Sequence, residues 1–159
     1  ESVRQDAESL SGDRHVLRVE IQAAARLSGV AQEIHSAISN LVFNAVRYTP
    51  AESTITLRWR PYRHGAALEV EDDGEGIDPI HIPRLTERFY RVDKGRSAET
   101  GGTGLGLAIV KHVLLNHDGE LEILSKIGDG SEFICHFPRE RLAEPNPEDE
   151  SASETSNEV

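Results

Sequence analysis

The chain has 159 residues, of which 37% are hydrophobic and 28% charged, and this length and composition suit one folded globular domain. It has no apolar stretch near the roughly 20 residues that a membrane-spanning helix needs. The net charge of -11 argues against nucleic acid as a partner, because phosphate binding needs a surplus of Lys and Arg on one face. The chain starts at Glu1 without a leader sequence, so we expect it to be a fragment of a longer protein.

Turn residues and charge divide the chain into three predicted segments. Residues 1–12 are a linker or the end of an upstream helix, since Ser-Gly-Asp at 11–13 stops the helical pattern. Residues 13–142 form the predicted domain. Residues 143–159 are rich in Pro and Ser, have no basic residue, and are expected to be disordered. The acidic residues of this tail are Glu144, Glu148, Asp149, Glu150, Glu154 and Glu158.

Hydrophobic spacing predicts the elements of the first half of the domain. Residues 15–21 alternate apolar and polar side chains as a half-buried strand does, and a shorter strand is expected near 27–30. Apolar residues then recur every three or four positions over 31–48, which predicts a long amphipathic helix ended by a Thr-Pro pair. Alternation returns at 54–60 and 66–71, which we interpret as two antiparallel strands.

The second half begins with a glycine-bearing loop at 72–77 and a connection at 78–103 that is long enough to be functional. A short helix is expected within it near 84–90. A helix is predicted over 105–117, followed by a strand pair joined by Gly-Asp-Gly at 120–127 and 132–138. This order of elements predicts an α+β two-layer sandwich in which helices cover one face of a mixed sheet.

The first polar cluster lies on the long helix. Asn40, Asn44 and Arg47 are four and three residues apart, so they project from one side of the helix. Amide oxygens suit Mg²⁺, which accepts one or two protein ligands beside phosphate oxygens, and Arg47 supplies positive charge for phosphate. The alternative is a solvated helix face with two incidental asparagines.

The second cluster is the acidic loop that follows the strand at 66–71. Gly74 and Gly76 permit tight turns and the close approach of a flat ligand. An ionised Asp72 can only accept hydrogen bonds, so it would favour the amino group of adenine over the carbonyl of guanine. An acidic surface turn explains this short motif equally well when it is taken alone.

The third cluster is the run GGTGLGL at 101–107, which opens the second helix. A glycine-rich run at a helix N-terminus exposes backbone N–H groups and the positive end of the helix dipole to phosphate oxygens. The run is neither a Walker sequence nor the G-x-G-x-x-G motif of dinucleotide folds. A glycine hinge without a ligand is the alternative.

In combination, these clusters resemble the sequence boxes of the histidine-kinase ATPase family, and they occur in the order of that family. The matches to the N, G1, F and G2 boxes are residues 40–50, 72–76, 88–93 and 102–107. The resemblance implies the Bergerat (GHKL) ATP-binding fold, with a mixed, mostly antiparallel sheet and a mobile lid over ATP between Asp78 and Gly102. Within the family, residues 83–94 and 104–112 are most similar to the sensor kinases of phosphate regulons.

The resemblance also implies roles for individual residues. Asn44 would coordinate Mg²⁺, Asp72 would hold the adenine amine, and Arg91, Arg88 and Asn44 would act in phosphoryl transfer. Phe89 is expected to pack the lid onto the domain. The residues implied to contact the nucleotide are Asn40, Asn44, Arg47, Tyr48, Asp72, Gly74, Gly76, Ile77, Gly102, Thr103, Gly104, Leu105 and Gly106.

The implied activity is transfer of the γ-phosphate of ATP to a histidine on a separate dimerisation domain. Ser36 stands four residues before Asn40, where related ATPases that use water have a glutamate, so hydrolysis is disfavoured. Residues 1–30 contain no acceptor motif, and the pair His117-Asp118 is expected to have a surface role at a helix end. A nucleotide-gated protein-binding module, like an anti-sigma-factor kinase, and a weak ATP hydrolase remain as alternatives.

The resemblance further implies a cellular setting. The full-length protein would be a homodimer anchored in the inner membrane, with this domain in the cytoplasm and monomeric in isolation. Its partner would be a cognate response regulator. The single cysteine, Cys135, lies in an alternating strand pattern, and we expect it to be a small packing residue and not a reactive thiol.

Overall fold

The computed structural model describes residues 2–92 and 102–144, and an open five-stranded sheet forms its centre. The strand order is β1-β3-β4-β6-β5. Strand β1 pairs parallel with β3, and the other neighbours pair antiparallel, which confirms the mixed, mostly antiparallel sheet. The strands are β1 (Val16–Ile21), β3 (Thr54–Tyr62), β4 (Gly65–Asp72), β5 (Glu120–Lys126) and β6 (Gly130–Phe137).

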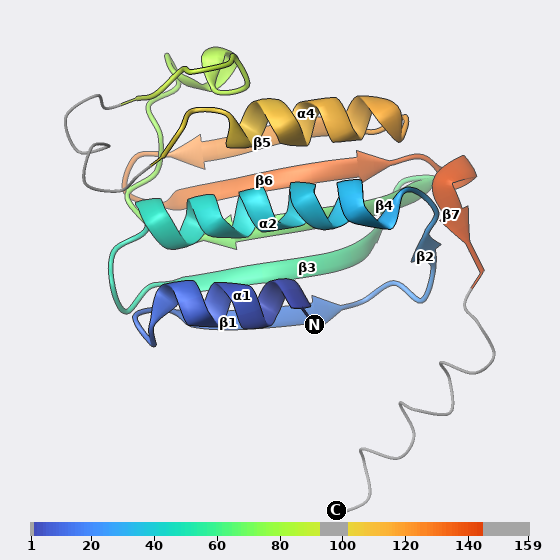
Figure 1. The fold of residues 1–159 in the computed structure, drawn as a ribbon, viewed down its shortest axis with the longest axis horizontal. Helices are drawn as coiled ribbons and strands as arrows, with labels where there is room; N and C mark the ends of the chain where they lie inside the picture. Colours follow the sequence, from blue (N-terminus) through green and yellow to red (C-terminus); the bar gives the residue numbers. More distant parts are fainter. Residues whose placement is uncertain (1, 93–101, 145–159) are drawn as a thin grey trace, which may run out of the picture.

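Within the described residues, three helices cover one face of this sheet (Figure 1). Two of them are the predicted long helices, and the third lies in the segment expected to be a linker or the end of an upstream helix. Helix α1 (Ser2–Ser11) lies over β1 and β3, α2 (Ala31–Tyr48) over the middle of the sheet, and α4 (Gly106–Asn116) over β5 and β6. None of the helices in the described ranges combines the length and the hydropathy needed to cross a bilayer. The two-layer architecture is therefore confirmed.

Helix α2 is amphipathic and has one apolar stripe. Its buried residues, spaced at helical intervals, face the sheet, and Thr49 ends the helix with an extended backbone before Pro50. The Thr49 N–H still donates to the Ala45 carbonyl at 3.0 Å, so the last turn is closed. The buried residues are Ala37, Ser39, Leu41, Val42, Ala45 and Val46.

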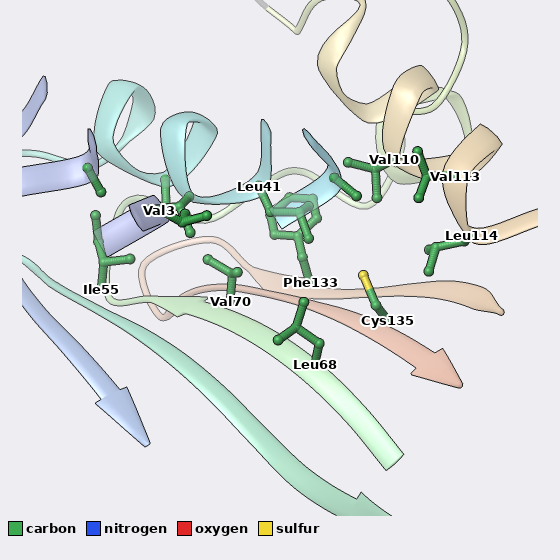
Figure 2. Close-up of a cluster of buried hydrophobic side chains, with 14 of the residues drawn as sticks. Val3, Leu41, Ile55, Leu68, Val70, Val110, Val113, Leu114, Phe133 and Cys135 are labelled. Atoms are coloured by element: carbon green, nitrogen blue, oxygen red, sulfur yellow. The ribbon is translucent and has the colours of Figure 1, made fainter. Parts of the chain in front are cut away.

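The core lies between the helices and the sheet (Figure 2). Alternate strand residues, such as Leu68 and Val70 of β4, point at Leu41 of α2 and Val110 of α4. Cys135 of β6 belongs to this cluster, and burial raises the pKa of its thiol to about 12. The predicted packing role of Cys135 is thus confirmed.

Some elements differ from their predicted form. The helix expected near 84–90 is instead a single 3-10 turn, η1 (Ile82–Arg84), because the prolines at 79 and 83 set the local backbone. The short strand β2 (Arg26–Leu27) pairs with the unpredicted β7 (Leu142–Ala143), which follows the 3-10 turn η2 (Arg139–Arg141). The predicted tail from 145 onward and the part of the lid at 93–101 lie outside the described residues.

His117 is buried, with 2% of its surface exposed, so the predicted surface role for this residue is wrong. Its Nδ1–H donates to the Val113 carbonyl at 2.7 Å, and its Nε2 accepts the Val30 N–H at 3.0 Å. The ring fills the space over Gly29, where a Cβ would lie 2.3 Å from its Cδ2 atom. His117 therefore joins the end of α4 to the start of α2, whereas Asp118 is exposed and pairs with Arg141.

The face of the sheet opposite the helices carries an ion network around Arg58. Its guanidinium contacts Glu20 at 2.8 Å, Glu69 at 3.0 Å and Glu71 at 3.2 Å, and these carboxylates raise its pKa. Glu69 is almost fully buried and also pairs with Arg60. A buried carboxylate of this kind depends on its cations, because an unpaired buried charge is costly.

Replacing Arg58 by Met should lower the free energy of unfolding by about 3 kcal/mol, because Glu69 would stay buried with one cation fewer. Urea denaturation would measure this loss. The double variant Arg58→Met/Glu69→Met should recover most of it, since both charges are then removed. A single variant within about 0.5 kcal/mol of the parent would mean that the network contributes only at the level of a surface salt bridge.

Candidate functional site

The polar side of α2 meets the start of α4. Asn40 donates its Nδ2–H to the Ser36 carbonyl at 2.8 Å, which leaves its Oδ1 free to face Gly106. A Cβ on Gly106 would lie 2.9 Å from Asn40 Oδ1 and 3.6 Å from Asn44 Nδ2. The structure therefore brings the two predicted asparagines together with the third predicted cluster, which is the glycine run before α4.

The last turn of α2 meets the C-terminal end of the long connection, where Arg91 from the middle of the same connection also approaches. A Cβ on Gly102 would lie 2.6 Å from the Tyr48 hydroxyl and 3.5 Å from Arg91 Nη2. Tyr48 is exposed and Arg91 is half-buried. An arginine and a hydroxyl thus border the glycine run at Gly102, while the asparagines border it at Gly106, and together the first two form a polar, cationic rim suited to phosphate oxygens.

Phe89 contacts the glycine run through its backbone. Its N–H donates to the Gly104 carbonyl at 2.8 Å, and a Cβ on Gly104 would lie 2.8 Å from Phe89 Cα. Gly104 has a φ of 70°, which a residue with a side chain adopts only with strain. The Phe89 ring is 71% exposed, so the prediction that this ring packs the lid onto the domain is wrong.

The start of α4 offers backbone donors. No side chain caps this helix, and the first helical hydrogen bond runs from the Ile109 N–H to the Leu105 carbonyl at 3.0 Å. The N–H groups of the first helical turn before Ile109 therefore have no helical acceptor, which is the arrangement that binds anions at helix N-termini. Leu105 donates its own N–H to Thr103 Oγ1 at 3.4 Å, and Thr103 is exposed.

Asp72 is the last residue of β4, and the loop that follows it lies against Thr49 at the C-terminal end of α2. Its Oδ1 accepts the Gly74 N–H at 3.0 Å. Burial raises the pKa of Asp72, the Gly74 hydrogen bond opposes this shift, and the negative charge of Asp73 adds to it. Asp73 itself accepts the Thr54 N–H at 2.8 Å, so it is directed at the strand and not at Gly74. Asp72 is thus a half-buried, fixed hydrogen-bond acceptor.

The β5–β6 hairpin supports the acidic loop, and sequence reasoning missed this contact. Ser125 Oγ accepts the Ile77 N–H at 2.8 Å, and the Glu75 carbonyl accepts the Gly128 N–H at 2.8 Å. Gly76 has a φ of 73°, and a Cβ there would overlap the Lys126 carbonyl. The glycines of the acidic loop and of the hairpin are visible in the sequence. The sequence does not show which loop each of them contacts.

Two predicted site residues are placed less closely. Arg47 in the last turn of α2 and Arg88 before Phe89 are both exposed. Each lies next in sequence to a residue that does border the site or contact its glycine run, Tyr48 for Arg47 and Phe89 for Arg88. Their side chains are long enough to reach a bound anion, so their roles stay a prediction.

The fold and the site define a nucleotide-binding ATPase domain. The family model described as histidine kinase-, DNA gyrase B-, and HSP90-like ATPase matches residues 29–141, and the chain belongs to this family. The curated relatives include the phosphate regulon sensor protein PhoR of Pseudomonas aeruginosa, 56% identical over 90% of this chain and 32% of its own length. PhoR of Haemophilus influenzae is 41% identical over 91% of this chain and 34% of its own length.

Solved structures of sensor kinases have the same fold. The mycobacterial sensor histidine kinase MprB matches 91% of this chain and 93% of its own, with a TM-score of 0.78 and 26% identity. ShkA, solved at full length in complex with AMPPNP, matches 86% of this chain and 29% of its own, with a TM-score of 0.71 and 25% identity. The chain therefore holds an ATPase domain of the histidine-kinase type, and it spans about a third of the length of the curated relatives that it matches.

Replacing Gly106 by Ala tests the contact with the asparagines. Alanine favours a helix over glycine by up to about 1 kcal/mol, so the melting temperature should stay or rise. The added Cβ would displace the Asn40 amide, and Mg²⁺-dependent binding of an ATP analogue should weaken by about tenfold, as happens when groups that orient metal ligands move. Leu115→Ala, at the exposed far end of α4, should leave this binding unchanged. Equal losses in both variants would contradict the contact.

Proposed function

We propose that this domain binds Mg-ATP and donates the γ-phosphate to a histidine on a separate dimerisation domain of the same protein. The observation that carries the proposal is the convergence of Asn40, Asn44, Tyr48 and Arg91 on the glycine run before α4. This convergence combines neutral oxygen donors, a cation and backbone N–H groups in one place. Phosphates with a divalent cation need all three.

The metal end of the proposed site lies on α2. The Asn40 Oδ1, whose direction is set by the bond from its Nδ2 to Ser36, and the adjacent Asn44 amide are hard, neutral donors. Such donors suit Mg²⁺, which keeps most of its waters and takes phosphate oxygens as further ligands. We assign Asn44 as the direct ligand and Asn40 as a partner of phosphate or of metal-bound water.

The base end of the proposed site lies at Asp72. An ionised carboxylate accepts the amino hydrogen of adenine and repels the carbonyl oxygen that guanine has at that place. Gly74 and Gly76 let the loop lie close against Thr49 and Lys126, and Ile77 would offer an apolar contact to the base. The related ShkA, which was solved in complex with AMPPNP, supports an adenine nucleotide as the ligand.

The proposed chemistry is transfer to a side chain and not to water. A hydrolase needs a base near the nucleotide, but α2 carries Ser36 there, and its carbonyl is engaged by Asn40. Arg91, beside Gly102, would neutralise charge on the transferred phosphoryl group, with Arg88 as a second cation and Arg47 and Tyr48 on the phosphate chain. The remaining glycines of the run, with Thr103 and Leu105, would line the phosphates.

We further propose a setting for the whole protein from its relatives. The two PhoR sequences favour a role in phosphate-starvation signalling, with PhoB as the cognate response regulator. The intact protein would be a homodimer in the inner membrane, and this domain would act in the cytoplasm. The phosphorylated histidine would belong to the dimerisation domain that precedes this domain in the full-length protein.

The raised pKa of Asp72 predicts the pH dependence of nucleotide binding. The ionised carboxylate accepts the hydrogen of the adenine amine more strongly than the protonated acid does, and a raised pKa means that protonation begins at a higher pH than for an ordinary aspartate. The affinity for ADP should therefore fall on mild acidification, before the domain unfolds. Calorimetric titration across this pH range would measure the fall. Asp72→Asn should bind more weakly and without this dependence, and an unchanged pH profile would argue against Asp72 as the base contact.

The transfer itself is tested with γ-labelled ATP and a dimerisation domain that carries an acceptor histidine. Acid-labile label on that histidine is the expected result, and Arg91→Ala should slow labelling by about a hundredfold or more while ADP affinity changes little. Arg88→Ala should have a smaller effect. Free phosphate without protein label would instead identify a hydrolase, and bound nucleotide without either product would identify a binding module.

A further inference from the structure

We propose that His15 is a positioning residue for adenine recognition, acting through Thr49 and Gly74 on the carboxylate of Asp72. This inference rests on the proposed nucleotide site and adds to it a residue that lies outside all four sequence boxes. It also names helix α1 as the element to which the base end of the site is attached. The argument depends on a buried chain of hydrogen bonds.

The hydrogen bonds define which nitrogen of the neutral His15 ring carries the hydrogen. Its Nε2 lies 3.0 Å from the Thr49 carbonyl, which can only accept, so Nε2 carries a hydrogen. In the neutral ring Nδ1 is then an acceptor, and it receives the Ser11 hydroxyl at 3.0 Å. The same Ser11 oxygen accepts the backbone N–H of His15 at 3.0 Å. Every polar atom of the His15 ring is therefore satisfied, and all three residues are buried.

Thr49 connects this network to the acidic loop. It is the residue at which α2 ends, and its carbonyl, which has no helical partner, is the one that His15 binds. The Thr49 methyl group would lie 3.1 Å from a Cβ on Gly74, so it packs directly against that glycine. Gly74 in turn donates its N–H to Asp72 Oδ1 at 3.0 Å. A shift of Thr49 would therefore move the Gly74 N–H, which orients the Asp72 carboxylate.

Ser11 connects the network to α1. It is the last residue of that helix and is fully buried, and its carbonyl also accepts the Arg14 Nε–H at 2.9 Å. The other end of α1 is fixed by Val3 and Ala7, which belong to the main core. The position of α1 on the sheet is thus linked by named contacts to the place where the purine amino group would be read.

A purely structural role of His15 makes a different prediction from a positioning role. A structural residue changes stability and, through it, all ligands alike. A positioning residue changes the discrimination between two bases that differ at the group Asp72 contacts and at the ring nitrogen next to it. ADP and IDP are such a pair, since IDP has a carbonyl oxygen where ADP has its amino group. The affinity ratio of ADP to IDP is therefore the informative measurement.

His15→Leu should lower this ratio by about fivefold, the equivalent of one hydrogen bond. His15→Gln, whose side-chain amide can still donate to the Thr49 carbonyl, should keep the ratio within about twofold of the parent. Ser11→Ala removes only a hydroxyl and should lower the ratio by an intermediate factor. Calorimetry at a temperature where circular dichroism shows each variant folded gives these values.

His117→Leu is the matched control. It also removes a buried histidine with two hydrogen bonds to α2 and α4, but at the opposite end of α2 from Thr49. It should lower the melting temperature and leave the ADP to IDP ratio unchanged. The proposal is overturned if His15→Leu keeps the parental ratio, if His117→Leu lowers it equally, or, should His15→Leu not fold, if Ser11→Ala keeps it. A parent chain that binds neither nucleotide would overturn the proposed function first.

Discussion

The antiparallel packing of α2 against α4 is the constraint on which the site depends. One end of the pair is held by His117, which bonds the start of α2, and by Asn116, which donates to Glu33 at 3.2 Å. At the other end, Gly106 lets the α4 backbone approach the asparagines of α2. Because the two helices are in close contact at both ends of the pair, the orientation of α2 is fixed and its polar side faces one part of the structure. That part is the glycine run with its free N–H groups.

Three glycines of this domain lie where two backbones come nearer than a side chain would allow. Gly104 lies against the backbone of Phe89, and Gly76 lies against the Lys126 carbonyl. Gly130 likewise meets the Asp72 carbonyl, so the β5–β6 hairpin and the acidic loop support each other. The phosphate end and the base end of the site therefore both depend on close contacts between the backbones of two loops.

The acidic loop illustrates how much could be inferred in advance. Asp72, Gly74 and Gly76 were visible as a motif, because an acceptor followed by two glycines has a chemical meaning by itself. Thr49 and Ser125, which hold this loop in place, carry no such meaning, since their roles arise from contacts with residues far away in the chain. His117 was misjudged for the same reason. Its sequence neighbours are those of a helix end, while its hydrogen-bond partner is 87 positions away.

The sequence alone determined the order of the five sheet strands and the two long helices, the two-layer fold class and the residues of the four boxes. Periodicity and chemically specific motifs are local properties, and local properties can be read from neighbouring residues. Only the tertiary structure decided which residues meet: Asn40 with Gly106, Tyr48 with Gly102, and His15 with Thr49. It also showed that Phe89 makes contact through its backbone and not its ring. Such pairings depend on how the helices pack on the sheet, and that packing minimises the free energy of the whole chain and not of any one segment.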